Sequence, residues 1–403
     1  MLALGKALMA RLTTALICIT KSKFFAGKPS LRSKLKGNAH GRIEAPRGKP
    51  RGIRSLPNSL NTMERNVGNA IMKTRSACLT GVDRIEARER ELTLGPDEVL
   101  VKTHLAGVCG QDKNLYHGII PPSGGLNTEM RTAFAYPYFL GHEGGGTVVA
   151  VGARVRDLTV GDRVISFGWI ETLSEYFKGK AEDLEKVPEG MDMDLASLGE
   201  PIACAVFSGL MSQVQFGDVV AVFGMGFAGQ IMAQVAKQKG AFKVIGVDVV
   251  DGKLALARSL GLDYAVNSAA QDPLAAIMKI TGGKGADVVV DMAGSADSVN
   301  LCTAAVRHNG VMVFYSWITQ DITVNISRWH NNSLEVVNTG LVHHGIKQRT
   351  LWTPLALRPV MQGQLNIAPL ITHRFPLDRI GEAFATAAND PTAIKVVIDP
   401  HRS

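Results

Sequence analysis

The stretch Val219-Val220-Ala221-Val222-Phe223-Gly224-Met225-Gly226-Phe227-Ala228-Gly229 decides the fold of the second half of the chain. Its apolar start predicts a buried strand, and residues 230–239 behind the glycines have helical spacing. A Gly-x-Gly-x-x-Gly turn between a strand and a helix is the context in which this turn binds dinucleotides. Gly224 permits the tight turn, Gly226 lets the backbone approach a pyrophosphate, and Gly229 lets the helix pack closely on the strand. The pyrophosphate is then expected at the free N–H groups of the helix start.

The next predicted strand ends at Asp248, 19 residues after Gly229. A carboxylate there accepts hydrogen bonds from the ribose hydroxyls of NAD and repels the 2′-phosphate of NADP, so we predict NAD. Lys253 is a possible phosphate contact that leaves some tolerance for NADP. The nicotinamide is expected near Ala293 and Tyr315-Ser316. The predicted cofactor-binding residues are Gly224, Gly226, Phe227, Ala228, Gly229, Asp248, Lys253, Ala293 and Ser316.

The second half of the chain alternates apolar strands with helical stretches. Strands are predicted at 218–223, 243–248, 286–291, 311–315 and 334–338. This rhythm predicts an α/β fold with a doubly wound parallel sheet covered on both faces. Elsewhere, β segments are predicted at 77–79, 98–103, 141–167 and 395–398, and a helix at 195–213.

The net charge of +8 is unevenly distributed along the 403 residues. Residues 1–62 hold 13 Lys or Arg and one acid, a net +12, so residues 63–403 carry −4. The basic charge therefore belongs to a leader that is predicted to be disordered, and it does not indicate nucleic-acid binding by the folded part. Three interpretations of the leader stay open: a start assigned too early, with Met63 or Met72 as the true start, an organelle-targeting segment, or a basic interaction tail.

Cysteine usage and hydropathy exclude further classes of protein. Five scattered cysteines without a C-x-x-C pair predict neither a disulfide framework nor a four-cysteine zinc site, and they favour a reducing, cytoplasmic compartment. No apolar run reaches the roughly 18 residues of a membrane span, so we expect no membrane partner.

Potential metal ligands lie upstream of the glycine turn. Cys109 lies in Gly-Val-Cys-Gly-Gln-Asp, His142 and Glu143 lie in Gly-His-Glu-Gly-Gly-Gly, and Glu200 lies in Gly-Glu-Pro. Each alone has an ordinary structural explanation, but a thiolate, an imidazole and carboxylates together suit Zn²⁺. With a dinucleotide turn downstream, they predict a dehydrogenase in which zinc acts as a Lewis acid on the substrate oxygen.

From about residue 73 onward, the chain resembles the medium-chain dehydrogenase/reductase superfamily, especially zinc-dependent sorbitol and threonine dehydrogenases. The matching motifs are at 107–112, 141–146, 161–164, 199–201, 224–229 and 371–384, followed by Lys395-Val396-Val397. The resemblance implies a GroES-like β-barrel catalytic domain (63–212 and 350–403), an inserted Rossmann domain (213–349), and a homodimer or homotetramer. It also implies that Cys109, His142 and Glu200 occupy zinc-ligand positions. Glu143 would bind directly, through water or by exchange with Glu200, and Asp112 would steady the site.

Three departures from the family pattern stand out. The segment between Val164 and Tyr176 is too short for the lobe that binds a structural zinc, so one zinc per chain is expected. Gln111 replaces the usual Ser or Thr, and Asn114 replaces a frequent His. Neither amide titrates near pH 7, so the usual proton relay is missing. The proton would leave through water, Glu143, Tyr116 or His117.

These observations favour NAD-linked oxidation of a secondary alcohol, such as a polyol, sugar or cyclitol. Amino alcohols and hydroxy acids stay open as substrates. An insert at 118–137, with Thr128, Glu129 and Arg131, would line the mouth of the cleft or form a plain surface loop. The alternatives are a zinc-free quinone or enone reductase of the same fold, and a non-enzymatic NAD-binding protein.

Overall fold

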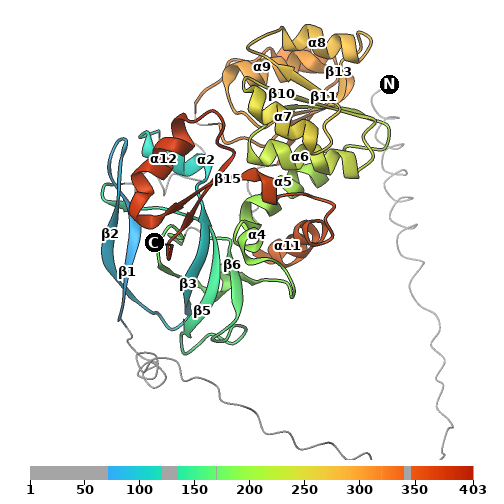
Figure 1. Ribbon diagram of the computed structural model, residues 1–403. Coiled ribbons are helices and arrows are strands. Elements are labelled where there is room, and N and C mark those ends of the chain that lie inside the picture. Colours follow the sequence, from blue (N-terminus) through green and yellow to red (C-terminus); the bar gives the residue numbers. More distant parts are fainter. Residues whose placement is uncertain (1–70, 120–134, 169, 319, 340–345, 403) are drawn as a thin grey trace, which may run out of the picture. The chain divides into compact units, whose positions relative to one another are not determined.

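The computed structural model describes residues 71–119, 135–168, 170–318, 320–339 and 346–402, which belong to one compact unit of the chain (Figure 1). The basic leader lies outside the described residues. Most of the 118–137 insert does so as well, including Thr128, Glu129 and Arg131.

A parallel sheet forms the second half of this unit. Its strands are β9 (Val219–Phe223), β10 (Lys243–Asp248), β11 (Tyr264–Asn267), β12 (Ala286–Asp291), β13 (Val306–Phe314) and β14 (Glu335–Asn338). They lie in the order β11-β10-β9-β12-β13-β14, and each neighbouring pair is parallel. This is the doubly wound order, in which the chain reverses direction across the sheet between β9 and β12. Ligands of such sheets bind at the carboxyl ends of the strands that flank this reversal.

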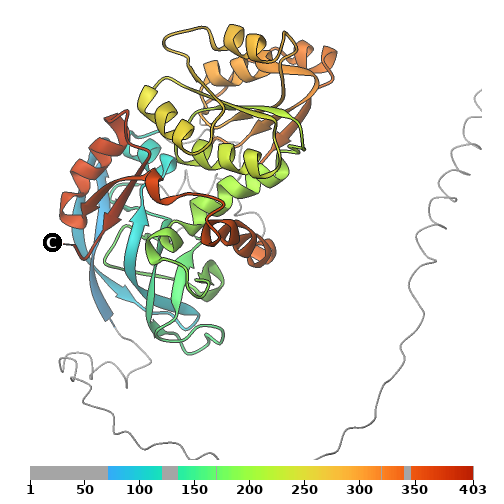
Figure 2. The same cartoon turned by 45° about the vertical axis from the view of Figure 1, so that its right-hand side comes forward.

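Helices cover both faces of the parallel sheet. They are α6 (Phe227–Gln238), α7 (Asp251–Ser259), α8 (Pro273–Ile280) and α9 (Ala296–Ala305). In β9, Val220 and Val222 belong to the core that contains residues of α6 and α7, whereas Ala221 and Phe223 belong to the core with residues of α8 and α9. Figure 2 shows α6 and α7 on one side of the sheet and α8 and α9 on the other. Burial on both faces explains the uninterrupted apolar run that opens the glycine turn.

The first half and the C-terminal segment together form two further sheets. The larger one has the order β15-β16-β3-β5-β6-β8, with β7 paired to β3, and the smaller one has the order β2-β1-β4. The bounds are β1 (Ile71–Gly81), β2 (Arg84–Thr93), β3 (Glu98–Gly107), β4 (Tyr138–Phe139), β5 (Glu143–Val151), β6 (Arg163–Ser166), β7 (Tyr176–Lys180), β8 (Leu184–Lys186), β15 (Ile371–Pro376) and β16 (Lys395–Asp399). Because β16 pairs with β3, the end of the chain returns to its first strands, as Figure 1 shows.

Six further helices complete the described part of the chain. They are α2 (Gly110–Tyr116), α4 (Met193–Ser197), α5 (Gly199–Met211), α10 (Ile326–Asn331), α11 (Ile346–Met361) and α12 (Ile380–Asn389), with short 3₁₀ turns at Ala181–Asp183, Ala368–Leu370 and Leu377–Arg379. One continuous core joins Leu105 of β3, Ile202 of α5, Ile231 of α6 and Leu357 of α11. The antiparallel half and the parallel half therefore share buried side chains, and a site between them rests on packed elements.

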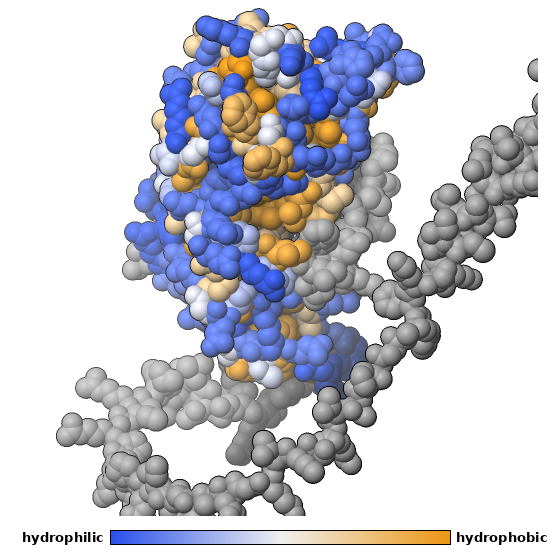
Figure 3. All heavy atoms as spheres, turned by 90° about the vertical axis from the view of Figure 1, so that its right-hand side faces the viewer, coloured by the Kyte–Doolittle hydropathy of each residue, from blue (hydrophilic) through white to orange (hydrophobic). Residues whose placement is uncertain are grey.

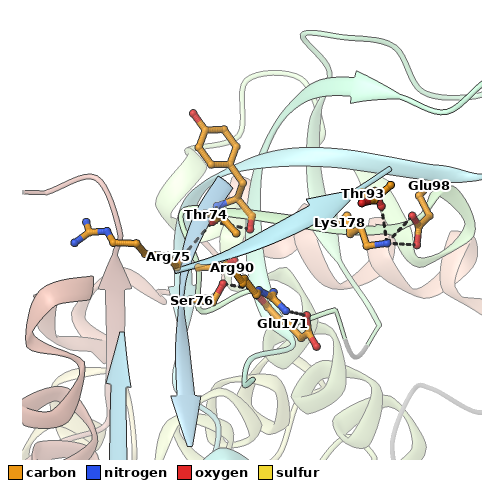
Figure 4. A network of polar contacts seen from close by, with 10 residues as sticks. Thr74, Arg75, Ser76, Arg90, Thr93, Glu98, Glu171 and Lys178 are labelled. Atoms are coloured by element: carbon orange, nitrogen blue, oxygen red, sulfur yellow. Dashed lines mark hydrogen bonds and ion pairs between the residues drawn. The ribbon is translucent and has the colours of Figure 1, made fainter. Parts of the chain in front are cut away.

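Polar contacts fasten the strands around the antiparallel half (Figure 4). The Arg90 Nε donates to Ser76 Oγ at 2.9 Å, and its guanidinium also pairs with Glu171. The Lys178 ammonium lies 2.8 Å from Glu98 and donates to the Thr93 carbonyl. The Arg90–Glu171 and Lys178–Glu98 pairs each join residues about 80 positions apart, so they tie β2 and β3 to segments distant in the sequence.

The structure confirms the predicted fold class and corrects several predicted bounds. Strands β10 and β12 have the predicted limits, whereas β13 begins at Val306, five residues earlier than predicted, and β11 was missed. The predicted helix 195–213 is two helices, α4 and α5, that meet at Leu198. The strand β11 was missed because its four residues, Tyr-Ala-Val-Asn, are too few for a periodic pattern to be evident.

Apolar side chains remain exposed on part of the surface. Leu210 and Met211 at the end of α5 and Leu355 and Met361 on α11 are among the exposed large apolar residues. Figure 3 shows apolar residues gathered in the middle of the face on which these helices lie. Within the described ranges, no helix combines the length and apolar character needed to cross a bilayer.

The packing of α6 on β9 predicts that replacement by alanine affects the stability of the protein differently at two glycines of the turn. A Cβ on Gly229 would lie 1.9 Å from the carbonyl oxygen of Gly224, whereas a Cβ on Gly226 would have no neighbour within 4 Å. We therefore expect Gly229→Ala to lower the free energy of unfolding by about 1–3 kcal/mol through overpacking. Gly226→Ala should leave stability near that of the wild type. Urea unfolding of both variants measures this, and equal stability losses would contradict the assigned packing.

Candidate metal and cofactor site

A cavity of about 400 Å³ lies between the antiparallel half and the carboxyl ends of the parallel strands. From the antiparallel half it is lined by α2, by Cys109 and Glu143, and by the start of β16. From the parallel half it is lined by the start of α6 and by segments 292–293 and 315–317, which follow β12 and β13. The cavity thus lies at the place where the strand order of the doubly wound sheet predicts a ligand.

Three of the four predicted metal ligands lie together beside this cavity. Potential ligand atoms of Cys109, His142 and Glu143 are all within 4.8 Å of one another. Cys109 directly precedes α2, His142 directly precedes β5, and Glu143 is the first residue of β5. Gly141 before them has a φ of +110°, and a Cβ there would lie 2.4 Å from the Leu173 backbone nitrogen. The glycine in the Gly-His-Glu motif is therefore required by the tight approach of the segment around Leu173.

Asp112 lies against both Cys109 and His142. Its Oδ2 accepts a hydrogen bond from the Cys109 backbone N–H at 2.9 Å, and its Oδ1 lies 3.7 Å from Nδ1 of His142. A carboxylate on the outer nitrogen of a histidine is the usual support of a metal-ligating imidazole. Burial raises the pKa of Asp112, and the charge of His142 opposes this shift.

The surroundings of the Cys109 thiol suit a metal ligand better than a free cysteine. Burial raises its pKa well above the usual value, and the negative charges of Glu143 and Asp112 raise it further. A divalent cation would reverse this effect, because a coordinating thiol is deprotonated by the charge of the ion. The donor set of sulfur, nitrogen and carboxylate oxygen within 4.8 Å is one that suits zinc.

A buried lysine that sequence reasoning had not assigned to the site lies against Glu143. The Lys395 Nζ is 2.7 Å from Glu143 Oε2, 3.4 Å from the Val108 carbonyl oxygen and 4.6 Å from the centre of the Phe227 ring. Both charged side chains are at most 5% exposed. Burial alone would lower the pKa of Lys395, but the charge and hydrogen bond of Glu143, together with the charges of Cys109 and Glu200, outweigh burial and raise the pKa. The sign of this role in the sequence is a charged lysine at the start of the otherwise apolar run 395–398.

Gly107 makes room for this pair. Strand β3 lies between β5 and β16, and its Gly107 is opposite Glu143 on one side and Val397 on the other. A Cβ on Gly107 would lie 2.2 Å from Glu143 Oε2. The glycine of the Gly-Val-Cys motif thus lets the carboxylate reach across the strand toward Lys395.

Glu200 is not part of the three-residue cluster. It is buried near the start of α5, where its Oε1 accepts a hydrogen bond from Cys204 Sγ at 3.2 Å. Its charge still contributes to the raised pKa of Cys109 and of Tyr315, so it faces the same region. Its predicted role as a ligand stays a prediction.

The glycine turn has the shape that a dinucleotide requires. Gly224 has a φ of +94°, and α6 starts at Phe227 without a side-chain cap on its free N–H groups. Of the predicted cofactor residues, Gly226, Phe227, Ala228, Gly229, Lys253, Ala293 and Ser316 line the cavity. Gly224 and Asp248 are not among the lining residues. Asp248 lies at the end of β10, where its carboxylate accepts hydrogen bonds from the N–H groups of Met225 in the glycine turn and of Val250, at 2.7 and 2.9 Å. The residues therefore fit a dinucleotide.

Asp291 organises the side of the cavity where the nicotinamide was predicted, and sequence reasoning had given it no role. This fully buried carboxylate at the end of β12 accepts hydrogen bonds from the Gly294 N–H at 3.2 Å and from Ser298 Oγ at 2.7 Å. It also binds the Ser316 hydroxyl. Asp291 therefore joins the two loops that follow β12 and β13.

The residues at the positions of the missing relay are polar but do not titrate. Gln111 and Asn114 line the cavity, as do Lys113 and Tyr315. His117 instead pairs with Asp83 at 2.6 Å on the surface, and Tyr116 packs against Phe384. Neither His117 nor Tyr116 lines the cavity, so the geometry does not support a proton path through them.

Comparisons with known proteins agree with this geometry. Residues 95–255 match the alcohol dehydrogenase GroES-like domain, and residues 228–352 match the zinc-binding dehydrogenase domain. An L-threonine 3-dehydrogenase of Bacillus subtilis is 29% identical over 71% of this chain and 87% of its own length. A mouse sorbitol dehydrogenase is 29% identical over 76% of this chain and 91% of its own length. A zinc-binding dehydrogenase of Sinorhizobium meliloti, solved with NADP, has a TM-score of 0.70 at 24% identity and covers 82% of this chain and 100% of its own.

The chain belongs to the zinc-type medium-chain dehydrogenase/reductase family. The predicted family and the predicted fold, with a GroES-like part and a Rossmann-type parallel sheet, are thereby confirmed. Membership implies zinc and a nicotinamide dinucleotide as cofactors.

The buried pair of Lys395 and Glu143 predicts that the metal-free protein loses much of its unfolding free energy when Lys395 is replaced. Lys395→Met leaves a buried carboxylate without its cation, which is expected to cost about 3–5 kcal/mol of unfolding free energy. Lys178→Met is the matched control, because its pair with Glu98 is about a third exposed and is expected to contribute no more than about 1 kcal/mol. Urea unfolding after chelation measures both, and similar losses would contradict a special role of the buried pair.

Proposed function

We propose that this protein is a zinc- and NAD-dependent dehydrogenase that oxidises a secondary alcohol of the polyol, sugar or cyclitol class. The observation that carries the proposal is the position of the Cys109–His142–Glu143 cluster beside the cavity that the glycine turn lines. An alcohol held at the cluster would lie in the same cavity as the nicotinamide end of the cofactor. The names of the threonine and sorbitol dehydrogenase relatives support action on a CH–OH group.

Cys109 and His142 would hold the zinc, with Glu143 as a third ligand or as a partner through water. When bound, zinc supplies a Lewis acid for the alcohol oxygen and NAD⁺ supplies the hydride acceptor. Asp112 orients His142 and Cys109 from behind. Lys395 neutralises Glu143 and so limits the negative charge that the cluster presents to the substrate. Glu200 is proposed as a ligand that exchanges with Glu143.

The proton released on oxidation is proposed to leave through water in the cavity. Gln111 and Asn114 line the cavity at the relay positions but do not titrate near pH 7. Glu143 also lines the cavity and is a carboxylate acceptor that the chain itself offers. This arrangement favours a water-dependent exit route. One zinc per chain is proposed because the segment between Val164 and Tyr176 is too short for a lobe that binds a structural zinc.

The proposed domain division follows the sheets. The catalytic domain would comprise residues 63–212 and 350–403, and the coenzyme domain residues 213–349. A homodimer or homotetramer is also proposed, and the exposed apolar side chains of α5 and α11 support contact with another chain.

The first test combines a metal measurement with a substrate screen. Purified protein is expected to hold about one zinc per chain, the single catalytic ion of this enzyme class, and to form NADH with members of a panel of polyols, cyclitols, sugars and amino alcohols. Cys109→Ala should remove zinc and activity but leave NADH binding intact, because the glycine turn is unchanged. Cys302→Ala, in the core of the parallel half, is the control and should keep zinc and activity. Full activity of Cys109→Ala would disprove the metal assignment, and quinone reduction without zinc would favour the reductase alternative.

The second test addresses NAD against NADP. Asp248→Ala removes the carboxylate that would bind the ribose hydroxyls and repel a 2′-phosphate. We expect the ratio of kcat/KM for NAD⁺ to that for NADP⁺ to fall by about tenfold or more, the equivalent of 1.4 kcal/mol of differential binding. Asp248→Asn, which keeps an acceptor for the Met225 N–H, controls for loss of the turn and should show the same change in preference. An unchanged ratio would mean that Asp248 does not select the cofactor.

A further inference from the structure

Lys113 places a positive charge at the cavity without a directly bonded acidic partner among the described residues. It follows Cys109 by one helical turn, since its N–H donates to the Cys109 carbonyl within α2, and its side chain is partly buried. Within the described ranges, no hydrogen bond or ion pair reaches its ammonium group, although it lines the cavity. Burial lowers its pKa, and the charge of Lys395 lowers it further. A partly buried cation of this kind is stabilised by a bound anion.

Gln111 supplies a second, independent observation. Its side chain is 6% exposed, it lines the same cavity, and its Nε2 has no hydrogen-bond partner among the described residues. A buried amide N–H₂ without an acceptor is costly, so such groups in protein interiors are normally satisfied. A ligand oxygen in the cavity would satisfy it. Gln111 and Lys113 lie two residues apart on the helix that Cys109 precedes.

The other two lysines that line the cavity, Lys395 and Lys253, differ from Lys113 in their surroundings. Lys395 is neutralised by Glu143 at 2.7 Å. Lys253 lies in α7, just behind the strand that ends at Asp248, and thus on the side where the cofactor ribose is expected. Lys113 is the cavity lysine nearest in sequence to the metal cluster, and the cluster residues Cys109 and Glu143 are among the charges that act on it.

We propose that Gln111 and Lys113 form an oxyanion-binding subsite beside the metal cluster, so that the preferred alcohol carries a carboxylate or phosphate group. The amide of Gln111 donates to one oxygen and the ammonium of Lys113 pairs with the charge of the same group. Charge-assisted hydrogen bonds of this type are stronger than the neutral contacts a plain polyol could make. The inference rests on the proposed function and narrows its substrate class from polyols in general to hydroxy acids or phosphorylated polyols.

The experiment measures ligand binding to the zinc-loaded full chain saturated with NADH, so that the cofactor phosphates already occupy their own site. Glucitol, gluconate and glucitol 6-phosphate share one carbon chain, and glycerol, glycerate and glycerol 3-phosphate form a shorter series. Calorimetry should show at least one anion binding about tenfold or more tighter than its neutral analogue. Comparing the carboxylate and phosphate members identifies which oxyanion is preferred.

Variants separate recognition from folding. Lys113→Met should abolish the preference for the anion and leave binding of the neutral analogue unchanged, whereas Lys113→Arg should retain the preference. Lys279→Met, an exposed lysine of α8 outside the cavity, should behave as the wild type. A merely structural role of Lys113 would weaken neutral and anionic ligands alike, and Lys113→Arg would not restore the difference.

Three results would overturn the inference. The first is equal or absent binding of anionic and neutral analogues by the wild type. The second is retention of the anion preference in Lys113→Met. The third is a weaker affinity of Lys113→Met for NADH alone with an unchanged anion preference, which would assign Lys113 to the cofactor phosphates. Failure of the proposed function is distinguishable, because it would appear as absent zinc and no oxidation of any alcohol, charged or neutral.

Discussion

The buried ion pair of Lys395 and Glu143 is the contact on which the site depends. It joins residues 252 positions apart, and Lys395 also lies over the Phe227 ring at the start of α6. One ammonium group of the C-terminal strand therefore contacts both the metal cluster and the first residue of α6. Two charges removed from water need good geometry and further contacts, and here the Val108 carbonyl and the aromatic ring supply them.

The order of the strands explains why this contact exists. Strand β3 lies between β5 and β16, and its Gly107 leaves space for the Glu143 side chain. In the parallel sheet, the reversal between β9 and β12 opens the crevice that the glycine turn lines. The shared core around Leu105, Ile231 and Leu357 then holds the two halves against one another. The cluster and the turn thus face one cavity because the packing of both sheets requires it.

The polar groups of the cavity suggest how this chain differs from its relatives. Gln111 and Asn114 have replaced side chains that usually start a proton relay, and Lys113 adds a cation next to them. These residues donate hydrogen bonds but do not offer a ready proton acceptor. The same replacement that removes the relay therefore equips the cavity for a substrate rich in negatively charged oxygen. The residues proposed for substrate recognition and those at the positions of the missing proton relay therefore lie on one short helix, α2.

The sequence by itself determined the fold class, the family and most of the candidate site. The strand, turn and helix at 219–239 and the motifs around Cys109 and His142 are local patterns, and short-range sterics constrain them strongly enough to be recognised without a structure. Only the tertiary structure decided that Glu143 joins Cys109 and His142 whereas Glu200 bonds to Cys204. It also decided that Lys395 and Asp291 belong to the site. Their contacts are made across strands and loops distant in sequence, and no local pattern encodes which buried charges will meet once the sheets have packed.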